Sequence, residues 1–160
     1  DLFSTKITTL FSNIDNIEKS VRESDLVIGA VLIPGAKAPK LVSREMISQM
    51  SKGSVVIDIA VDQGGCIETC KPTTHQEPTF VVDGVTHYCV ANMPGAVAQT
   101  STYALTNVTL RYAQMIAKLG VEEACKKDDA LKLGLNIYKG DLVYKQIADD
   151  LDLQYTTLKI

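Results

Sequence analysis

Residues 54–61 read Ser54-Val55-Val56-Ile57-Asp58-Ile59-Ala60-Val61, and Asp62-Gln63-Gly64-Gly65 follows them directly. The apolar residues of this run stand on successive positions rather than on alternate ones, which is typical of a strand buried on both faces of a parallel sheet. A second run of the same kind covers residues 25–32. The two runs predict two buried strands.

A helix is predicted before each of these strands. Residues 10–24 carry apolar side chains at helical spacing, with Ser12, Asn13 and Asp15 as candidate N-caps. Ser43 stands where it would cap a second helix. Because helices and buried strands alternate in this way in parallel sheets, the sequence predicts an α/β fold.

The rest of the chain predicts a hairpin and then a helical tail. Residues 80–82 and 85–90 flank Asp83-Gly84, a pair typical of hairpin turns. From residue 96 an apolar stripe predicts a long helix that stops at Gly120, with shorter helices after it. We therefore expect a sheet domain over residues 1–95 and a helical segment over residues 96–160.

Composition excludes several classes of partner. The 160 residues are 46% hydrophobic and carry a net charge of −3, and lysine and arginine form no basic stripe. This argues against nucleic acid or an anionic membrane surface as the partner. The longest apolar run, residues 26–34, is much shorter than the ~20 residues that span a bilayer. With neither an initial Met nor a signal peptide, we expect a fragment of a longer, soluble protein.

Cysteine and histidine positions predict no metal site. Cys66 and Cys70 lie too far apart for a typical zinc motif, and no other ligands complete a set. We expect all four cysteines to be free thiols in a reducing cytoplasm. His75 is expected in a polar loop and His87 on the outer side of a hairpin arm, neither of them catalytic.

Polar residues follow the predicted strands where ligands bind in open α/β sheets, beyond the carboxyl ends of the strands. Asp62 fits proton transfer or stabilisation of a developing positive charge, and it equally fits a turn. Asn92 is either a turn former or an amide donor to a substrate carbonyl. Asp58, inside its strand, is expected to be a buried structural carboxylate.

One motif expected of a dinucleotide-binding domain is missing. No G-x-G-x-x-G cluster occurs in the 160 residues. Either the chain is not a nucleotide domain, or the first βαβ half lies upstream of Asp1. The way the sequence starts favours the second interpretation.

Several long stretches, in order and correctly spaced, resemble the bacterial L-alanine dehydrogenase family. They include Asp62-Gln63-Gly64-Gly65-Cys66 and Asn92-Met93-Pro94-Gly95, within residues 25–40, 56–66, 88–97 and 100–107. The resemblance implies that residues 1–95 are the second half of a Rossmann NAD domain and that residues 96–160 complete a substrate domain. It also implies a cytoplasmic homohexamer that converts L-alanine reversibly to pyruvate and ammonium with NAD.

The same resemblance assigns residues to the site. Asp62 matches the family's active-site aspartate beside the nicotinamide, and Asn92 lies near the substrate. Residues matching cofactor-lining positions are Ser12, Val31, Leu32, Ile59, Asp62, Lys71, Val90, Ala91, Asn92 and Met93. The family's catalytic histidine and substrate-binding lysine and arginine belong to an N-terminal portion, so we expect the 160-residue chain to be inactive alone.

Two other interpretations remain at this point. The first is the NAD-binding domain of a nicotinamide nucleotide transhydrogenase, a related protein with the same fold. The loop Asp62-Gln63-Gly64-Gly65-Cys66 resembles the dehydrogenase form more closely. The second is a non-catalytic NAD-binding module, in which an intact Asp62 loop would have no evident purpose.

Overall fold

The computed structural model describes residues 6–160, so the first five residues of the predicted domain 1–95 lie outside the described part. The chain divides into two compact units. The first contains residues up to Leu32 together with Lys37–Met93, and the second contains Ile33–Ala36 together with Pro94–Ile160. All of the candidate site residues lie in the first unit.

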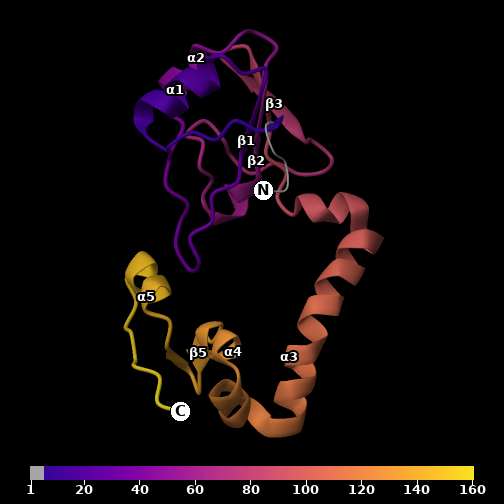
Figure 1. Cartoon of the computed structure of the whole chain (residues 1–160), viewed down its shortest axis with the longest axis vertical. Helices are drawn as coiled ribbons and strands as arrows, with labels where there is room; N and C mark the ends of the chain where they lie inside the picture. Colours follow the sequence, from indigo (N-terminus) through magenta and orange to yellow (C-terminus); the bar gives the residue numbers. More distant parts are fainter. Residues whose placement is uncertain (1–5) are drawn as a thin grey trace. The chain divides into compact units, whose positions relative to one another are not determined.

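The first unit is built on a four-stranded sheet (Figure 1). Its strands are β1 (Leu26–Gly29), β2 (Val55–Asp58), β3 (Thr79–Val82) and β4 (Val85–Tyr88). The spatial order is β1-β2-β4-β3; β1, β2 and β4 run parallel, and β3 is antiparallel to β4. The predicted α/β fold with a mainly parallel sheet is confirmed.

Two helices, α1 (Ile14–Arg22) and α2 (Arg44–Ser48), pack on one face of this sheet. The Asn13 side chain caps α1 by accepting a hydrogen bond of 2.8 Å from the backbone of Asn16, and Ser43 caps α2 in the same way. The core between the helices and the sheet contains Val21, Met46, Ile47, Val56 and Val85.

Two predictions about the strands are wrong in detail. Leu26 and Ile28 are 52% and 55% exposed, because α1 and α2 cover only the other face of β1, where Val27 packs against the core. The strand predicted over residues 54–61 ends at Asp58, and a 3-10 helix, Ile59–Gln63, follows it. Asp62 therefore lies in a helical turn beyond the strand.

The hairpin was predicted correctly. Asp83 and Gly84 have φ of 53° and 85°, so both central residues of the turn are left-handed, as a two-residue hairpin requires. Val82 pairs with Val85 across this turn. The second arm is shorter than predicted and ends at Tyr88.

The second unit is helical apart from one small hairpin (Figure 1). Gly120, with φ 76° and ψ 164°, interrupts its long helix where the sequence predicted the stop. No helix within residues 6–160 is long and apolar enough to cross a membrane. The elements are α3 (Ala98–Lys127), α4 (Asp129–Leu133), β5 (Ile137–Tyr138), β6 (Asp141–Leu142) and α5 (Lys145–Leu151).

Candidate active site

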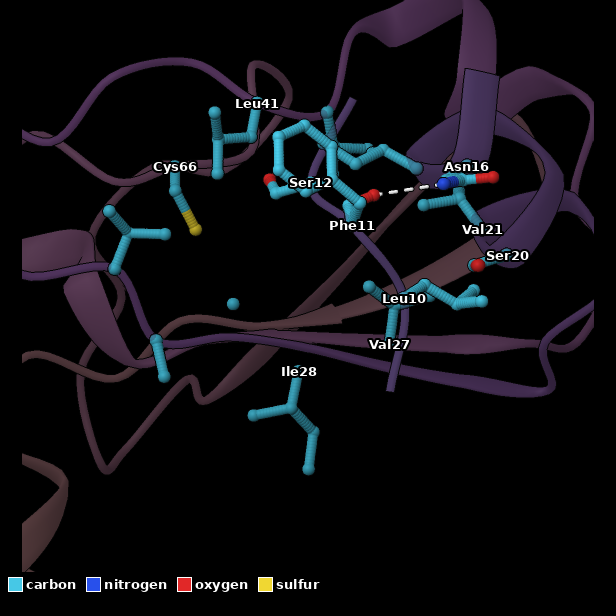
Figure 2. A pocket seen from close by; sticks show the side chains of 15 residues that line it. Leu10, Phe11, Ser12, Asn16, Ser20, Val21, Val27, Ile28, Leu41 and Cys66 are labelled. Atoms are coloured by element: carbon cyan, nitrogen blue, oxygen red, sulfur yellow. Dashed lines mark hydrogen bonds between the residues drawn. The ribbon is translucent and has the colours of Figure 1, made fainter. Parts of the chain in front are cut away.

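A mostly apolar pocket of about 320 Å³ opens beside β1 and the start of α1. Figure 2 shows the side chains that line it, with the hydrogen bond of 2.9 Å from the Asn16 amide to the Phe11 carbonyl. Gly29 lies in its wall, where an added Cβ would collide with the sulfur of Cys66. Of the residues predicted to contact the cofactor, Ser12 and Val31 line this pocket.

The loop after β2 is fixed by the buried carboxylate of Asp58. Its Oδ1 accepts a hydrogen bond of 3.0 Å from the Ala60 N–H, and its Oδ2 accepts one of 3.0 Å from the Ile67 N–H. The Cys66 thiol donates to Oδ1 at 3.6 Å. Burial raises the pKa of Cys66, which keeps this thiol protonated as a donor. The prediction of a structural role for Asp58 is confirmed.

Lys40 also holds this loop, through two of its backbone carbonyl groups. Its Nζ donates to the Gly64 carbonyl at 2.6 Å and to the Ile67 carbonyl at 3.4 Å. Lys40 was not predicted from the sequence, because a single lysine separated by 24 positions from its partner leaves no local pattern. Asp58 and Lys40 together fix both ends of the turn that carries Asp62.

Asp62 and Asn92 meet beyond the ends of the neighbouring strands β2 and β4. The Asn92 N–H donates to Oδ2 of Asp62 at 3.3 Å. Asn92 has φ of 56°, a left-handed conformation that asparagine tolerates better than most residues. His75 also reaches this point, where its Nε2 donates to the Asn92 carbonyl at 3.1 Å. All three side chains are exposed, so they are open to a ligand.

The remaining residues predicted to line the cofactor differ in how accessible they are. Leu32 and Ile59 are exposed, Ala91 and Met93 are half-buried, and Val90 is 1% exposed. Val90 is therefore closed to direct contact with a ligand in this conformation.

Lys71 and His87 both contact the ring of Phe80. The ammonium group of Lys71 lies 5.0 Å from the centre of the Phe80 ring, within range of a cation–π contact. His87 stacks on the same ring at 4.9 Å.

The placement of His87 on the outer side of the hairpin was wrong, because its side chain is fully buried. Its Nδ1–H donates to the Val85 carbonyl at 2.9 Å, and Nε2 accepts a hydrogen bond of 2.7 Å from the Thr69 hydroxyl. Burial lowers the pKa of His87, which favours the neutral ring that this arrangement needs. His87 therefore joins β4 to the loop that contains Thr69.

Comparison with known proteins identifies the family. The family model described as "Alanine dehydrogenase/PNT, C-terminal domain" matches residues 1–145. The chain belongs to this family. Within residues 6–160, no group of three or more His, Cys, Asp or Glu side chains is arranged to hold a metal ion.

Individual members of the family are closely similar to this chain. Alanine dehydrogenase of Halomonas elongata is 57% identical over 155 residues, which cover 97% of this chain and 42% of that protein. Alanine dehydrogenase of Staphylococcus haemolyticus is 59% identical over 160 residues, which cover 99% and 43%. The chain thus spans less than half the length of the curated relatives it matches.

Solved structures agree with this family membership and with a Rossmann-like α/β fold. A structure of L-alanine dehydrogenase matches with a TM-score of 0.78 and 49% identity, covering 94% of this chain and 42% of that one. A transhydrogenase structure from Sinorhizobium meliloti matches with a TM-score of 0.56 and 32% identity, covering 65% and 30%. The likeness to the transhydrogenase is weaker in every respect.

Proposed function

We propose that the full-length protein containing this chain is an NAD-dependent L-alanine dehydrogenase, which interconverts L-alanine with pyruvate and ammonium. The observation that carries the proposal is the hydrogen bond between Asn92 and Asp62. This bond joins the backbone N–H of Asn92 to the carboxylate of Asp62 beyond the carboxyl ends of two parallel strands, where open α/β sheets bind their ligands. Identity of 57–59% to two alanine dehydrogenases supports the same reaction.

NAD is the cofactor that fits the residues present. The pocket beside β1 is mostly apolar, and apolar walls of this kind suit a flat ring system. We assign Ser12 and Val31 to this part of the site. Leu32, Ile59 and the segment 90–93 are assigned to the same cofactor, and Lys71 is assigned to it on the resemblance alone. When bound, NAD supplies the hydride acceptor for the reaction.

Asp62 is the proposed catalytic residue of this chain. Its exposed carboxylate is fixed by the Asn92 N–H, and its loop is held by Asp58 and Lys40. A fixed negative charge at this position favours the positive charge that develops on the amine-bearing carbon of the substrate. The Asn92 side chain is assigned to the substrate, with its left-handed backbone setting its direction.

The remaining assignments follow the family. We propose that residues 1–95 belong to the NAD-binding domain and that residues 96–160 complete the substrate domain. The full-length protein is proposed to be a cytoplasmic homohexamer. Its mass in solution, measured by light scattering, tests the oligomeric state directly.

The experiment that tests the function uses the full-length protein with NAD and L-alanine. We expect NADH to form only when both are present, and pyruvate to accumulate in equal amount. A second assay measures hydride transfer from NADH to an oxidised nicotinamide analogue without alanine. Transfer in the second assay with none in the first would replace the proposal by the transhydrogenase function. NAD binding with neither reaction would indicate a non-catalytic module.

A further inference from the structure

Asn92, the proposed substrate residue, has a backbone conformation that needs support from its surroundings. Its φ of 56° lies in the left-handed region, which residues other than glycine adopt only at a cost in free energy. Such a conformation persists where neighbouring groups fix it. The contacts of the Asn92 backbone therefore decide where its side chain is directed.

Side chains from two other segments hold the backbone of Asn92. Its N–H donates to Oδ2 of Asp62 at 3.3 Å, which ties it to the loop after β2. Its carbonyl accepts a hydrogen bond of 3.1 Å from Nε2 of His75, in the loop that precedes β3. A carbonyl can only accept, so Nε2 carries the proton in this contact. Asn92 is thus held on its N–H side by a carboxylate and on its carbonyl side by an imidazole.

The loop that carries His75 is itself fastened to the segment that follows β4. The Thr73 N–H donates to the Cys89 carbonyl at 2.9 Å, and the Ala91 N–H donates to the Thr73 carbonyl at 3.0 Å. The Thr73 hydroxyl donates to the Pro78 carbonyl at 3.0 Å, which closes the loop over residues 73–78. The fold therefore places the imidazole of His75 at the end of β4.

His75 acts on the backbone of Asn92 and not on the reacting atoms. Its Nε2–H is used by the Asn92 carbonyl, so this nitrogen is not available to take a proton from a substrate. Both residues are exposed, so water can replace the imidazole when it is removed. The loss of this hydrogen bond is therefore expected to have a moderate effect.

We propose that His75 is a positioning residue for the substrate, because it fixes the left-handed backbone of Asn92 from the carbonyl side. This inference rests on the proposed function, in which the Asn92 side chain contacts L-alanine. Without His75 only the bond to Asp62 holds Asn92, and its backbone adopts other conformations for part of the time. The substrate then binds only to the fraction of molecules in which Asn92 is correctly placed, which weakens its apparent affinity by that fraction.

The test compares the steady-state kinetics of full-length His75→Ala, His75→Gln and Gln76→Ala with those of the unmodified protein. In His75→Ala we expect KM for L-alanine to rise about 3- to 10-fold, with kcat and KM for NAD changed less than about twofold, as for loss of one neutral hydrogen bond. His75→Gln is expected to restore most of the affinity, because its side-chain amide is also a donor. Gln76→Ala, at the neighbouring exposed position, is expected to match the unmodified protein.

A second measurement needs no turnover. Hydrogen–deuterium exchange of the full-length protein is followed by mass spectrometry in peptides that contain Asn92. We expect its N–H to exchange about 3- to 10-fold faster in His75→Ala, because the hydrogen bond to Asp62 opens more often when the backbone is held less tightly.

Three kinetic outcomes would overturn the proposal. The first is an unchanged KM for L-alanine in His75→Ala. The second is a lower kcat with no change in KM, which a smaller folded fraction alone would produce. The third is a His75→Gln protein with the same KM as His75→Ala.

Failure of the proposed function would look different. An unmodified protein that binds NAD without converting L-alanine would refute that function, and the exchange measurement then decides on His75 by itself. Faster exchange of the Asn92 N–H in His75→Ala would support its positioning role, and unchanged exchange would overturn it.

Discussion

The backbone N–H of Asn92 donates a hydrogen bond of 3.3 Å to Oδ2 of Asp62, joining segments that follow two neighbouring parallel strands. The two residues are 30 positions apart in the sequence. Their meeting depends on the parallel pairing of β2 with β4, which brings both carboxyl ends to one edge of the sheet. Residues that stabilise this edge are therefore expected to influence the candidate site.

Replacement of Asp58 by Asn is expected to destabilise the protein. The new amide would place a donor against the Ala60 or the Ile67 N–H, both of which now donate to the carboxylate. A buried N–H left without an acceptor, together with the loss of hydrogen bonds to a charge, costs about 3 kcal/mol. We expect a lower midpoint of thermal unfolding, measured by calorimetry. Asp141→Asn, at an exposed position, is the matched control, and an equal midpoint in the two variants would contradict the role of Asp58.

Gly65→Ala tests the close approach of the loop to Asp58. Gly65 has φ of 73°, and a Cβ there would lie 2.7 Å from Oδ2 of Asp58. Gly53 has φ of 89° but nothing within 4 Å of its Cβ position, so Gly53→Ala carries the backbone strain without the collision. Gly65→Ala is expected to lower the free energy of unfolding by roughly 1–3 kcal/mol more than Gly53→Ala does, because overpacking a filled site costs that much. Equal losses of stability in the two variants would show that the contact is unimportant.

The burial of His87 predicts that the stability of the protein depends on pH. Burial lowers its pKa in the folded state, so protons bind more readily to the unfolded chain. Its contribution to stability is therefore complete above the unfolded pKa of ~6.5 and is lost as the pH falls through that value. We expect the thermal midpoint to fall less steeply between pH ~7.5 and ~5 in His87→Gln than in the unmodified protein. His75→Gln is the control at an exposed position, and identical slopes in all three proteins would refute the prediction.

Local signals predicted the elements well. Asn13 and Ser43 cap helices as expected, Asp83-Gly84 makes the hairpin turn, and Gly120 interrupts the long helix. Each of these features depends on the residue itself and a few neighbours in the sequence. The same kind of reasoning identified Asp58 as a buried, hydrogen-bonded carboxylate.

Long-range contacts could not be predicted in this way. The burial of His87 depends on Thr69 and Phe80, and the role of Lys40 depends on carbonyl groups 24 and 27 positions away. The exposure of Leu26 and Ile28 depends on which face of the sheet the helices cover. None of these arrangements leaves a periodic signal, since each is set by packing between elements.

The role of Asp62 is tested by the steady-state kinetics of full-length Asp62→Asn with L-alanine and NAD. We expect kcat to fall by about 10²–10⁴, as for loss of a group that acts on the reacting atoms. Binding of NAD, followed by fluorescence titration, is expected to remain, and Asp141→Asn should match the unmodified enzyme. An Asp62→Asn enzyme with undiminished kcat would contradict the assignment of Asp62 as the catalytic residue of this chain.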